Sequence, residues 1–86
     1  MDGFSNLSNL RELNINRCGR LTNVDGLRNL TNLTELTISY CRSLTNVDGL
    51  RNLTNLRNLF LDGCNSLTRD KIDKLKEALS ETDISF

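Results

Sequence analysis

The sequence repeats itself at an interval of 23 residues. The 13 residues from Leu21 to Leu33 (LTNVDGLRNLTNL) recur unchanged from Leu44 to Leu56, and a looser copy of the same phrase begins at Phe4. Apolar residues keep the same places in every copy. Such a period is typical of chains that fold as a stack of equivalent turns, each of which buries its apolar side chains against the next turn.

Most apolar residues within a copy are three positions apart. One step of two interrupts each copy, at residues 13–15, 36–38 and 59–61. An α-helix requires a period of 3.6 and a strand a period of 2, whereas steps of three suit tight 3₁₀-like turns. We therefore predict a short strand at each step of two and 3₁₀ or irregular structure elsewhere. The strands would stack in parallel, about 4.8 Å apart.

The C-terminal segment has a different rhythm, with apolar residues at helical spacing. They are Ile72, Leu75 and Leu79. This stripe lies beside charged residues and predicts a helix over residues 69–80. Thr68 or Asp70 would cap its start, and Asp70 would pair with Lys74 one turn later.

Residues 82–86 alternate between polar and apolar side chains and predict a fourth strand. In it, Ile84 and Phe86 would take the places that Leu59 and Leu61 occupy one turn earlier. The helix before this strand would cap the last layer of leucines.

The repeated pattern LxxLxLxxC resembles the leucine-rich repeat family, in a short variant with cysteine where asparagine is more common. The resemblance covers nearly the whole chain. It is greatest to short bacterial and protozoan repeats, internalin-like ones included, although the cysteine departs from the internalin pattern. It implies an α/β solenoid: a right-handed coil with a short parallel concave sheet, a 3₁₀ or irregular convex side and a C-terminal helix cap. It also implies binding of other proteins, without any shared catalytic activity.

One domain accounts for all 86 residues. Three turns and a cap are close to the minimum of about three repeats that a stable stack requires. The first four residues align with Val24 to Leu27, in the middle of a turn, so we expect a segment of a longer repeat array. The units are approximately residues 4–26, 27–49 and 50–67, followed by the C-terminal helix and last strand at 68–86.

Charge and composition exclude several classes of partner. Lysine plus arginine and aspartate plus glutamate number 11 each, so no overall field favours nucleic acid or an anionic membrane. No apolar run approaches the 18 or so residues of a membrane span. The chain has no histidine and no glycine-rich phosphate loop. We predict a protein that is not an enzyme, holds no cofactor and binds another protein.

An Asp-Gly pair occurs in both full copies, at residues 25–26 and 48–49. We interpret it as a turn in which glycine permits positive φ. Each aspartate would form an ion pair on the convex edge with the arginine three residues later, Arg28 or Arg51. A paired-carboxylate catalytic site is the alternative, but no base accompanies it.

Three cysteines, Cys18, Cys41 and Cys64, also recur at the 23-residue interval. Metal ligands usually come in pairs two to five residues apart, and adjacent parallel strands align poorly for a disulfide. We therefore predict no metal and expect buried free thiols that act as small apolar groups. Free thiols favour a reducing, intracellular compartment, although localisation remains open.

Four tripeptides fit the pattern of N-glycan acceptors, beginning at Asn6, Asn29, Asn32 and Asn52. A secreted protein could carry sugars there. They also arise from an Asn-Leu-Thr turn that is copied with the repeat, and its polar side chains could satisfy backbone groups between the bends.

Positions where the copies differ indicate where a partner binds, because packing dictates the others. We predict a patch around Tyr40 and Phe60 with Arg17 and Arg57 beside them, since aromatic residues and arginine are enriched at interface hot spots. The alternative is that these aromatic rings only cover their neighbours. The complete set of predicted partner-binding residues is Arg11, Asn14, Arg17, Glu35, Thr37, Tyr40, Arg57, Phe60 and Asp62.

The N-terminal edge lacks a cap comparable with the C-terminal helix. Phe4, Leu7 and the edge of the first strand would be exposed there, which invites weak self-association. Two other functions remain open. The verbatim copy suits an engineered or structural scaffold without a dedicated ligand, and the glycan acceptors suit a fragment of a secreted recognition receptor.

Overall fold

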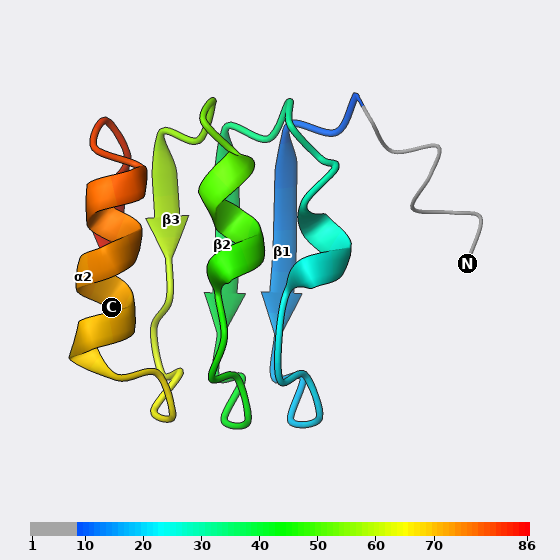
Figure 1. Cartoon of the computed structure of the whole chain (residues 1–86). Coiled ribbons are helices and arrows are strands. Elements are labelled where there is room, and N and C mark those ends of the chain that lie inside the picture. The colour runs from blue at the N-terminus through cyan, green and yellow to red at the C-terminus, as the bar shows by residue number, and fades with distance from the viewer. Residues whose placement is uncertain (1–8) are drawn as a thin grey trace.

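The computed structural model describes residues 9–86. Within them, short strands form one sheet, and helical segments cover one of its faces (Figure 1). The predicted alternation of strands with 3₁₀ turns is confirmed. The elements are β1 (Glu12–Asn16), the 3₁₀ helix η1 (Asp25–Leu27), β2 (Glu35–Ser39), the 3₁₀ helix η2 (Asp48–Asn52), β3 (Asn58–Phe60), the α-helix α2 (Arg69–Ala78) and β4 (Asp83–Ser85).

All strands are parallel and lie in chain order, β1-β2-β3-β4. Leu13 lies beside Leu36, Leu36 beside Leu59, and Leu59 beside Ile84. The first two offsets equal the repeat, whereas the last is longer because its turn contains α2 in place of a 3₁₀ helix. The register and the fourth strand are therefore as predicted.

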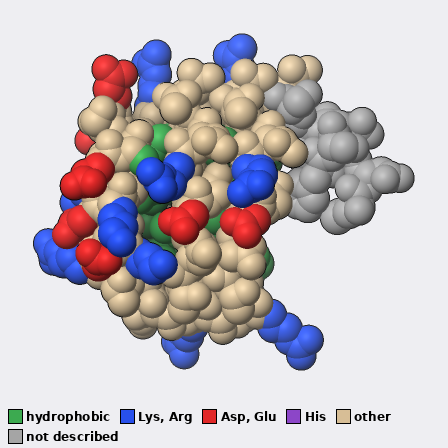
Figure 2. Space-filling view, viewed as in Figure 1, with side chains coloured by type: hydrophobic (Ala, Val, Ile, Leu, Met, Phe, Trp, Pro, Cys, Tyr) green, Lys and Arg blue, Asp and Glu red, His purple; other side chains and the backbone are tan. Residues whose placement is uncertain are grey.

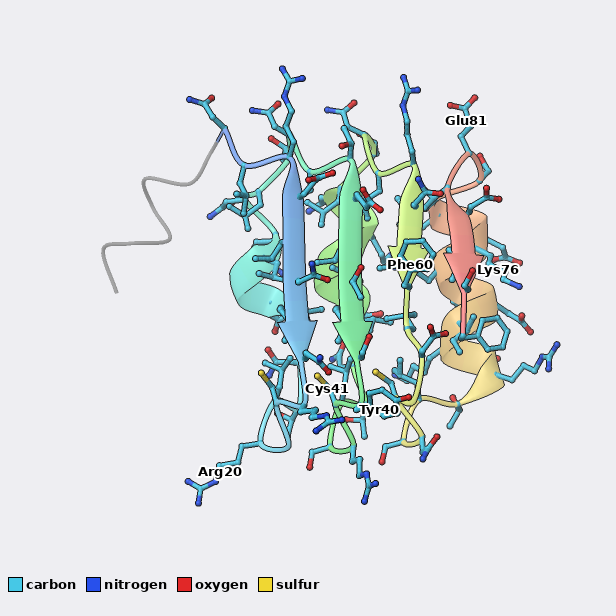
Figure 3. The ribbon with its side chains drawn as sticks, turned by 180° about the vertical axis from the view of Figure 1, so that it is seen from behind. Arg20, Tyr40, Cys41, Phe60, Lys76 and Glu81 are labelled. Atoms are coloured by element: carbon cyan, nitrogen blue, oxygen red, sulfur yellow. The ribbon has the colours of Figure 1, made fainter. Side chains whose placement is uncertain are left out.

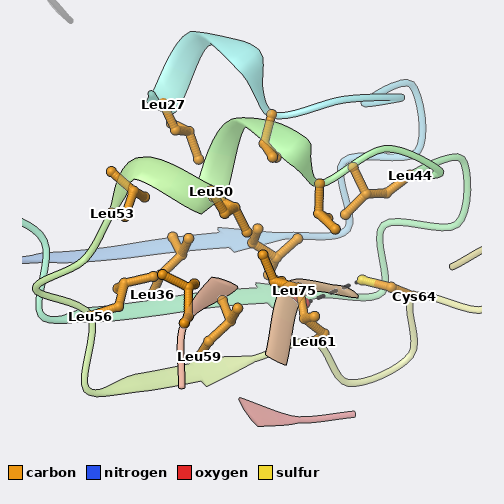
Figure 4. Packing of buried hydrophobic residues seen from close by; sticks show 14 of the residues in the cluster. Leu27, Leu36, Leu44, Leu50, Leu53, Leu56, Leu59, Leu61, Cys64 and Leu75 are labelled. Atoms are coloured by element: carbon orange, nitrogen blue, oxygen red, sulfur yellow. Dashed lines mark hydrogen bonds between the residues drawn. The ribbon is translucent and has the colours of Figure 1, made fainter. Parts of the chain in front are cut away.

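The core is a ladder of leucines between the sheet and the helical side (Figure 4). Leu36, Leu59 and Leu50 have no exposed surface, and no polar or charged side chain within residues 9–86 is buried. Leu13 and Ile15 in β1 are only partly buried. The described part of the chain places a neighbouring turn on one side of them alone.

The α2 helix begins as predicted. Thr68 Oγ1 accepts a hydrogen bond from the Lys71 N–H at 3.3 Å, and Lys74 Nζ lies 3.5 Å from the Asp70 carboxylate. The helix ends at Ala78, two residues earlier than predicted.

Phe86 does not take the place of a buried core residue, so that prediction was wrong. Its ring is 50% exposed, whereas Leu61 one turn earlier is buried. The β4 strand ends at Ser85, and the ring lies on the outside of the cap, where Lys76 Nζ is 4.8 Å and the Arg69 guanidinium 5.5 Å from its centroid. Two cations on an aromatic face stabilise this exposed position.

The asparagine that precedes each Asp-Gly pair begins a 3₁₀ turn. The Asp25 N–H donates to Asn23 Oδ1 at 3.1 Å, and the Asp48 N–H donates to Asn46 Oδ1 at 2.8 Å. A side-chain oxygen that accepts from a backbone N–H two residues later is the usual Asx turn. The repeated asparagine is therefore explained by backbone hydrogen bonding.

The predicted ion pairs of Asp25 with Arg28 and of Asp48 with Arg51 do not form. The pair in α2 is the one ion pair within 4 Å that residues 9–86 contain. All four side chains are exposed. A surface pair in water gains too little to hold two mobile side chains together. Basic and acidic side chains are nevertheless intermixed over the helical face (Figure 2).

The prediction of positive φ at the Asp-Gly turns was also wrong. Gly63 is the one glycine in the described range with positive φ, 75°. Gly49 is buried because η2 lies directly against the Val24 backbone of the preceding turn. Its repeat equivalent, Gly26, has no atom of the described residues within 4 Å of its Cβ position, apart from those of its chain neighbours. Close approach between turns, rather than backbone conformation, therefore requires glycine at residue 49.

All three cysteines are free, but only Cys41 and Cys64 are buried. Cys18 is exposed, contrary to prediction, because it belongs to the first described turn. The buried thiols donate to backbone carbonyls, Cys41 to Ser39 at 3.6 Å and Cys64 to Ile38 at 3.3 Å. Burial raises the pKa of the Cys41 thiol and so keeps it protonated.

Among the glycan acceptor tripeptides, the one at Asn6 lies outside the described residues, as do Phe4 and Leu7. The other three asparagines are exposed. Thr34, from one of these tripeptides, donates through Oγ1 to the Arg11 carbonyl at 3.2 Å. That carbonyl also accepts the Thr34 and Glu35 N–H groups. Asn55, the copy of Asn32, donates through Nδ2 to the Thr31 carbonyl at 2.9 Å, so a polar side chain of the copied turn satisfies a backbone group of the preceding turn, as expected.

Candidate partner-binding face

The sheet has one face that no helix covers, which we call the open face (Figure 3). It corresponds to the predicted concave side. Alternate side chains of each strand point to it, because successive residues of a strand face opposite sides. Its members are Glu12, Asn14, Asn16, Glu35, Thr37, Ser39, Asn58, Phe60, Asp83 and Ser85.

A single column crosses the centre of the open face. Register places Asn14 beside Thr37, Thr37 beside Phe60, and Phe60 beside Ser85. Three predicted partner-binding residues therefore lie side by side. Phe60 is partly buried by its neighbours, which leaves part of its ring for a partner.

A second column carries acidic residues near the amino ends of the strands. Glu12 lies beside Glu35, followed by Asn58 and Asp83. A side-chain hydrogen bond with Glu12 raises the pKa of Glu35, and burial and the neighbouring negative charge add to the effect. A raised pKa favours the protonated carboxyl in the folded protein. The pair thus contributes stability at acid pH that is lost as pH rises through the pKa of Glu35.

A third column lies just beyond the carboxyl ends of the strands, at Arg17, Tyr40 and Gly63. All three have positive φ, 58°, 56° and 75°. This conformation costs a residue other than glycine roughly 1–2 kcal/mol. Backbone hydrogen bonds hold it, since the Arg17 N–H donates to Ser39 and the Tyr40 N–H to Asp62, both at 2.8 Å.

Tyr40 is the aromatic centre of this column. Its side chain is 51% exposed, and its ring covers Gly63 so closely that a Cβ there would lie 2.5 Å from Tyr40 Cδ1. The Arg17 guanidinium lies 5.9 Å from the ring centroid. Tyr40 in the second turn therefore lies between Arg17 of the first turn and Gly63 of the third.

A pocket of about 500 Å³ opens at this edge of the sheet. It is lined by Arg17, Gly19, Tyr40 and Arg42, and we call it the edge pocket. Sequence reasoning identified Arg17 and Tyr40 but missed Gly19 and Arg42. The signal was present, because Arg42 lies two positions after Tyr40 in a segment without acidic residues.

Among the other predicted site residues, Asp62 adjoins Tyr40, since its carbonyl accepts from the Tyr40 N–H, whereas Arg11 and Arg57 are separated from it. Arg57 precedes β3 and lines a different hollow, of about 490 Å³, at the amino edge of the sheet with Glu81 and Asp83. Arg11 precedes β1 at that same edge. Arg57 therefore does not accompany Tyr40 as predicted. Figure 3 shows Tyr40 and Glu81 at opposite edges.

A third hollow, of about 320 Å³, lies at the N-terminal end of the stack. We call it the end hollow. It is almost entirely apolar and lies at the first-turn end of the leucine ladder. Its lining consists of Ile15, Cys18, Leu21, Asn23, Val24, Gly26 and Leu27.

No group of three histidine, cysteine, aspartate or glutamate side chains within residues 9–86 is placed to hold a metal ion. In the same range, no helix has the length and apolar character required to span a bilayer.

A family model for leucine-rich repeats, two copies, matches residues 8–52, which include β1, β2 and both 3₁₀ helices. No curated protein sequence matches the chain. The match covers more than half of the chain, and the parallel strands and 23-residue register agree with it. The chain belongs to the leucine-rich repeat family.

Proposed function

We propose that this protein is a non-catalytic interaction module that binds a partner protein on the open face of its sheet. Leucine-rich repeat domains generally mediate protein–protein interactions and are generally not enzymes. The assignment of partner binding to the open face depends on where the copies of the repeat differ in sequence. The identical 13-residue phrase builds the 3₁₀ turns, whereas the sequences diverge in the strands and in the loops that follow them.

Divergence on the open face is what a recognition surface requires. The same backbone column holds asparagine, threonine, phenylalanine and serine at residues 14, 37, 60 and 85. Packing does not demand these differences, because the core positions beneath them are uniformly leucine or isoleucine. Tyr40 adds a half-exposed aromatic ring beside this column, and such rings provide large contact area at low entropic cost.

We expect Tyr40→Ala and Phe60→Ala each to reduce partner capture at least tenfold, since truncation of an interface hot spot costs about 2 kcal/mol or more. The melting temperature should fall by less than about 4–8 °C, which corresponds to a loss of about 1 kcal/mol. The experiment is affinity capture from a source extract, with thermal unfolding of each variant in parallel. Arg51→Ala on the opposite side is the control and should capture normally.

A large loss of melting temperature in either variant would show that the ring is structural. Equal capture by all variants would place the partner elsewhere on the molecule. An empty capture with the unmodified chain would favour a scaffold that has no dedicated ligand.

We also propose weak self-association through the N-terminal edge. Arg11 and Arg17 direct backbone groups toward β2. By alternation, the N–H and C=O groups of Glu12, Asn14 and Asn16 face the outer edge. No strand within the described residues pairs there. A second copy could pair with this edge and cover the end hollow.

In a sedimentation experiment, this contact should make the apparent mass increase as the protein concentration is raised to high micromolar values. Leu21→Lys places a charge in the end hollow and should abolish the increase. Thr22→Lys adds the same charge at an exposed neighbouring position outside the hollow and should not. A constant monomer mass in the unmodified chain would contradict self-association.

A further inference from the structure

We propose that the edge pocket binds a carboxylate from an acidic segment of the partner. This inference rests on the proposed function, since it names the chemistry by which the same surface would recognise its partner. Two arginines, Arg17 and Arg42, line the pocket together with Tyr40, and the Arg17 guanidinium lies 5.9 Å from the Tyr40 ring centroid. Arginine binds carboxylates in a bidentate geometry, which supplies both energy and direction.

The two segments that line the pocket are positive even though the whole chain is neutral. No aspartate or glutamate occurs between Glu12 and Asp25, or between Glu35 and Asp48. Those two segments contain Arg17, Arg20 and Arg42 instead, and none of the three lies within 4 Å of a carboxylate of residues 9–86. Arg20 projects outward beyond the same edge (Figure 3). Charge complementarity therefore favours an anionic ligand at this edge.

The backbone at the pocket is held in place before any ligand binds. Ser43 Oγ donates to the Gly19 carbonyl, and Ser66 Oγ donates to the Arg42 carbonyl. Each bond joins a loop to the loop of the adjacent turn. Binding consequently needs little reorganisation of the loops, which is the usual advantage of a preorganised site.

The backbone conformation provides an independent argument. Arg17 and Tyr40 have positive φ at the position where the third turn has Gly63. Glycine accommodates this conformation without strain. Residues that keep a strained conformation cluster at binding sites, and here both contribute their side chains to one pocket.

Size and surroundings favour a short acidic peptide over a nucleic acid. A volume of about 500 Å³ accommodates one or two side chains. Asp62 borders the pocket, since its carbonyl accepts from the Tyr40 N–H, and the open face beyond carries Glu35 and Glu12. These carboxylates would repel a continuous polyanion. A partner with a localised acidic residue avoids that repulsion.

The test is a fluorescence anisotropy titration with a labelled peptide of alternating glutamate and alanine, at about 50 mM salt where screening is moderate. We expect saturable binding that weakens as salt is raised. The same peptide with glutamine in place of glutamate should bind at least tenfold more weakly, because a hydrogen bond to a charged group is lost.

Two variants locate the binding. Arg17→Gly fits the left-handed backbone and should fold at least as well as the parent, yet bind the acidic peptide about tenfold more weakly. Arg42→Gln should have a similar effect. Arg51→Gln removes the same charge from the opposite side and is the matched control, with unchanged affinity expected.

Equal binding of the glutamate and glutamine peptides, or equal loss in all three variants, would overturn the proposal. Tighter binding of a single-stranded oligonucleotide than of the acidic peptide would overturn it as well. A failure of the acidic-ligand proposal can be distinguished from a failure of the proposed function. Partner capture that depends on Tyr40 and Phe60 but is unaffected by Arg17→Gly would leave the module intact and refute the acidic ligand.

Discussion

Replacement of Leu36 by alanine is expected to destabilise the protein by roughly 2–5 kcal/mol, the usual cost when a buried leucine leaves a cavity. Leu36 has no exposed surface and lies between Leu13 and Leu59 in the middle of the ladder. A chain of this length has a total stability of roughly 4–13 kcal/mol. The variant should therefore lose a large part of its folded population. Urea denaturation followed by circular dichroism measures the change.

The matched control is Leu13→Ala, the same substitution at the equivalent place in the first turn. Leu13 is only partly buried, so its truncation removes less contact and should cost roughly 1–2 kcal/mol. Equal losses in the two variants would mean that something covers the first turn as completely as the second. A negligible loss for Leu36→Ala would contradict the described core.

Most of the fold could be predicted from the sequence because its determinants are local and repeated. The single step of two within each copy indicated the strands, and the spacing of Ile72, Leu75 and Leu79 indicated α2. The register followed from the repeat length alone, since identical turns must stack at identical positions. Because the local sequence pattern repeats, it also predicts how the turns pack against one another.

Errors occurred where the neighbours of a turn decide the outcome. Cys18 and Phe86 have the pattern of core residues but are exposed, because each lies at an end of the described stack. Periodicity shows which side of a turn a residue occupies. It does not show whether another turn covers that side.

The candidate site was predicted only in part, because the sequence indicates the register of the strands but not the path of the loops. The column of Asn14, Thr37 and Phe60 follows directly from the register. The edge pocket requires knowledge of how the loops after the strands bend, and Arg42 belongs to such a loop. Arg57 was placed with the aromatic residues although it lies before its strand, whereas Tyr40 follows its own.

The sharpest test of turn packing uses two glycines in identical sequence contexts. Gly26 and Gly49 occupy the same place in the 13-residue phrase. A Cβ on Gly49 would lie 2.8 Å from the Val24 carbonyl oxygen and 2.9 Å from Asp25 Cα, both backbone atoms. We expect Gly49→Ala to destabilise the protein by roughly 1–3 kcal/mol, the usual cost of overpacking, because η2 would have to move away from the preceding turn.

Gly26→Ala should have the opposite sign. A Cβ there meets nothing within 4 Å, and the residue does not have positive φ. Alanine restricts the unfolded chain more than glycine does, so a gain of about 0.4–1 kcal/mol is expected. Urea denaturation of both variants at low micromolar concentration measures the two effects. Equal changes in the free energy of unfolding would show that the turns do not pack against one another as described. A loss of stability in Gly26→Ala that grows with protein concentration would show that a second copy packs against the first turn.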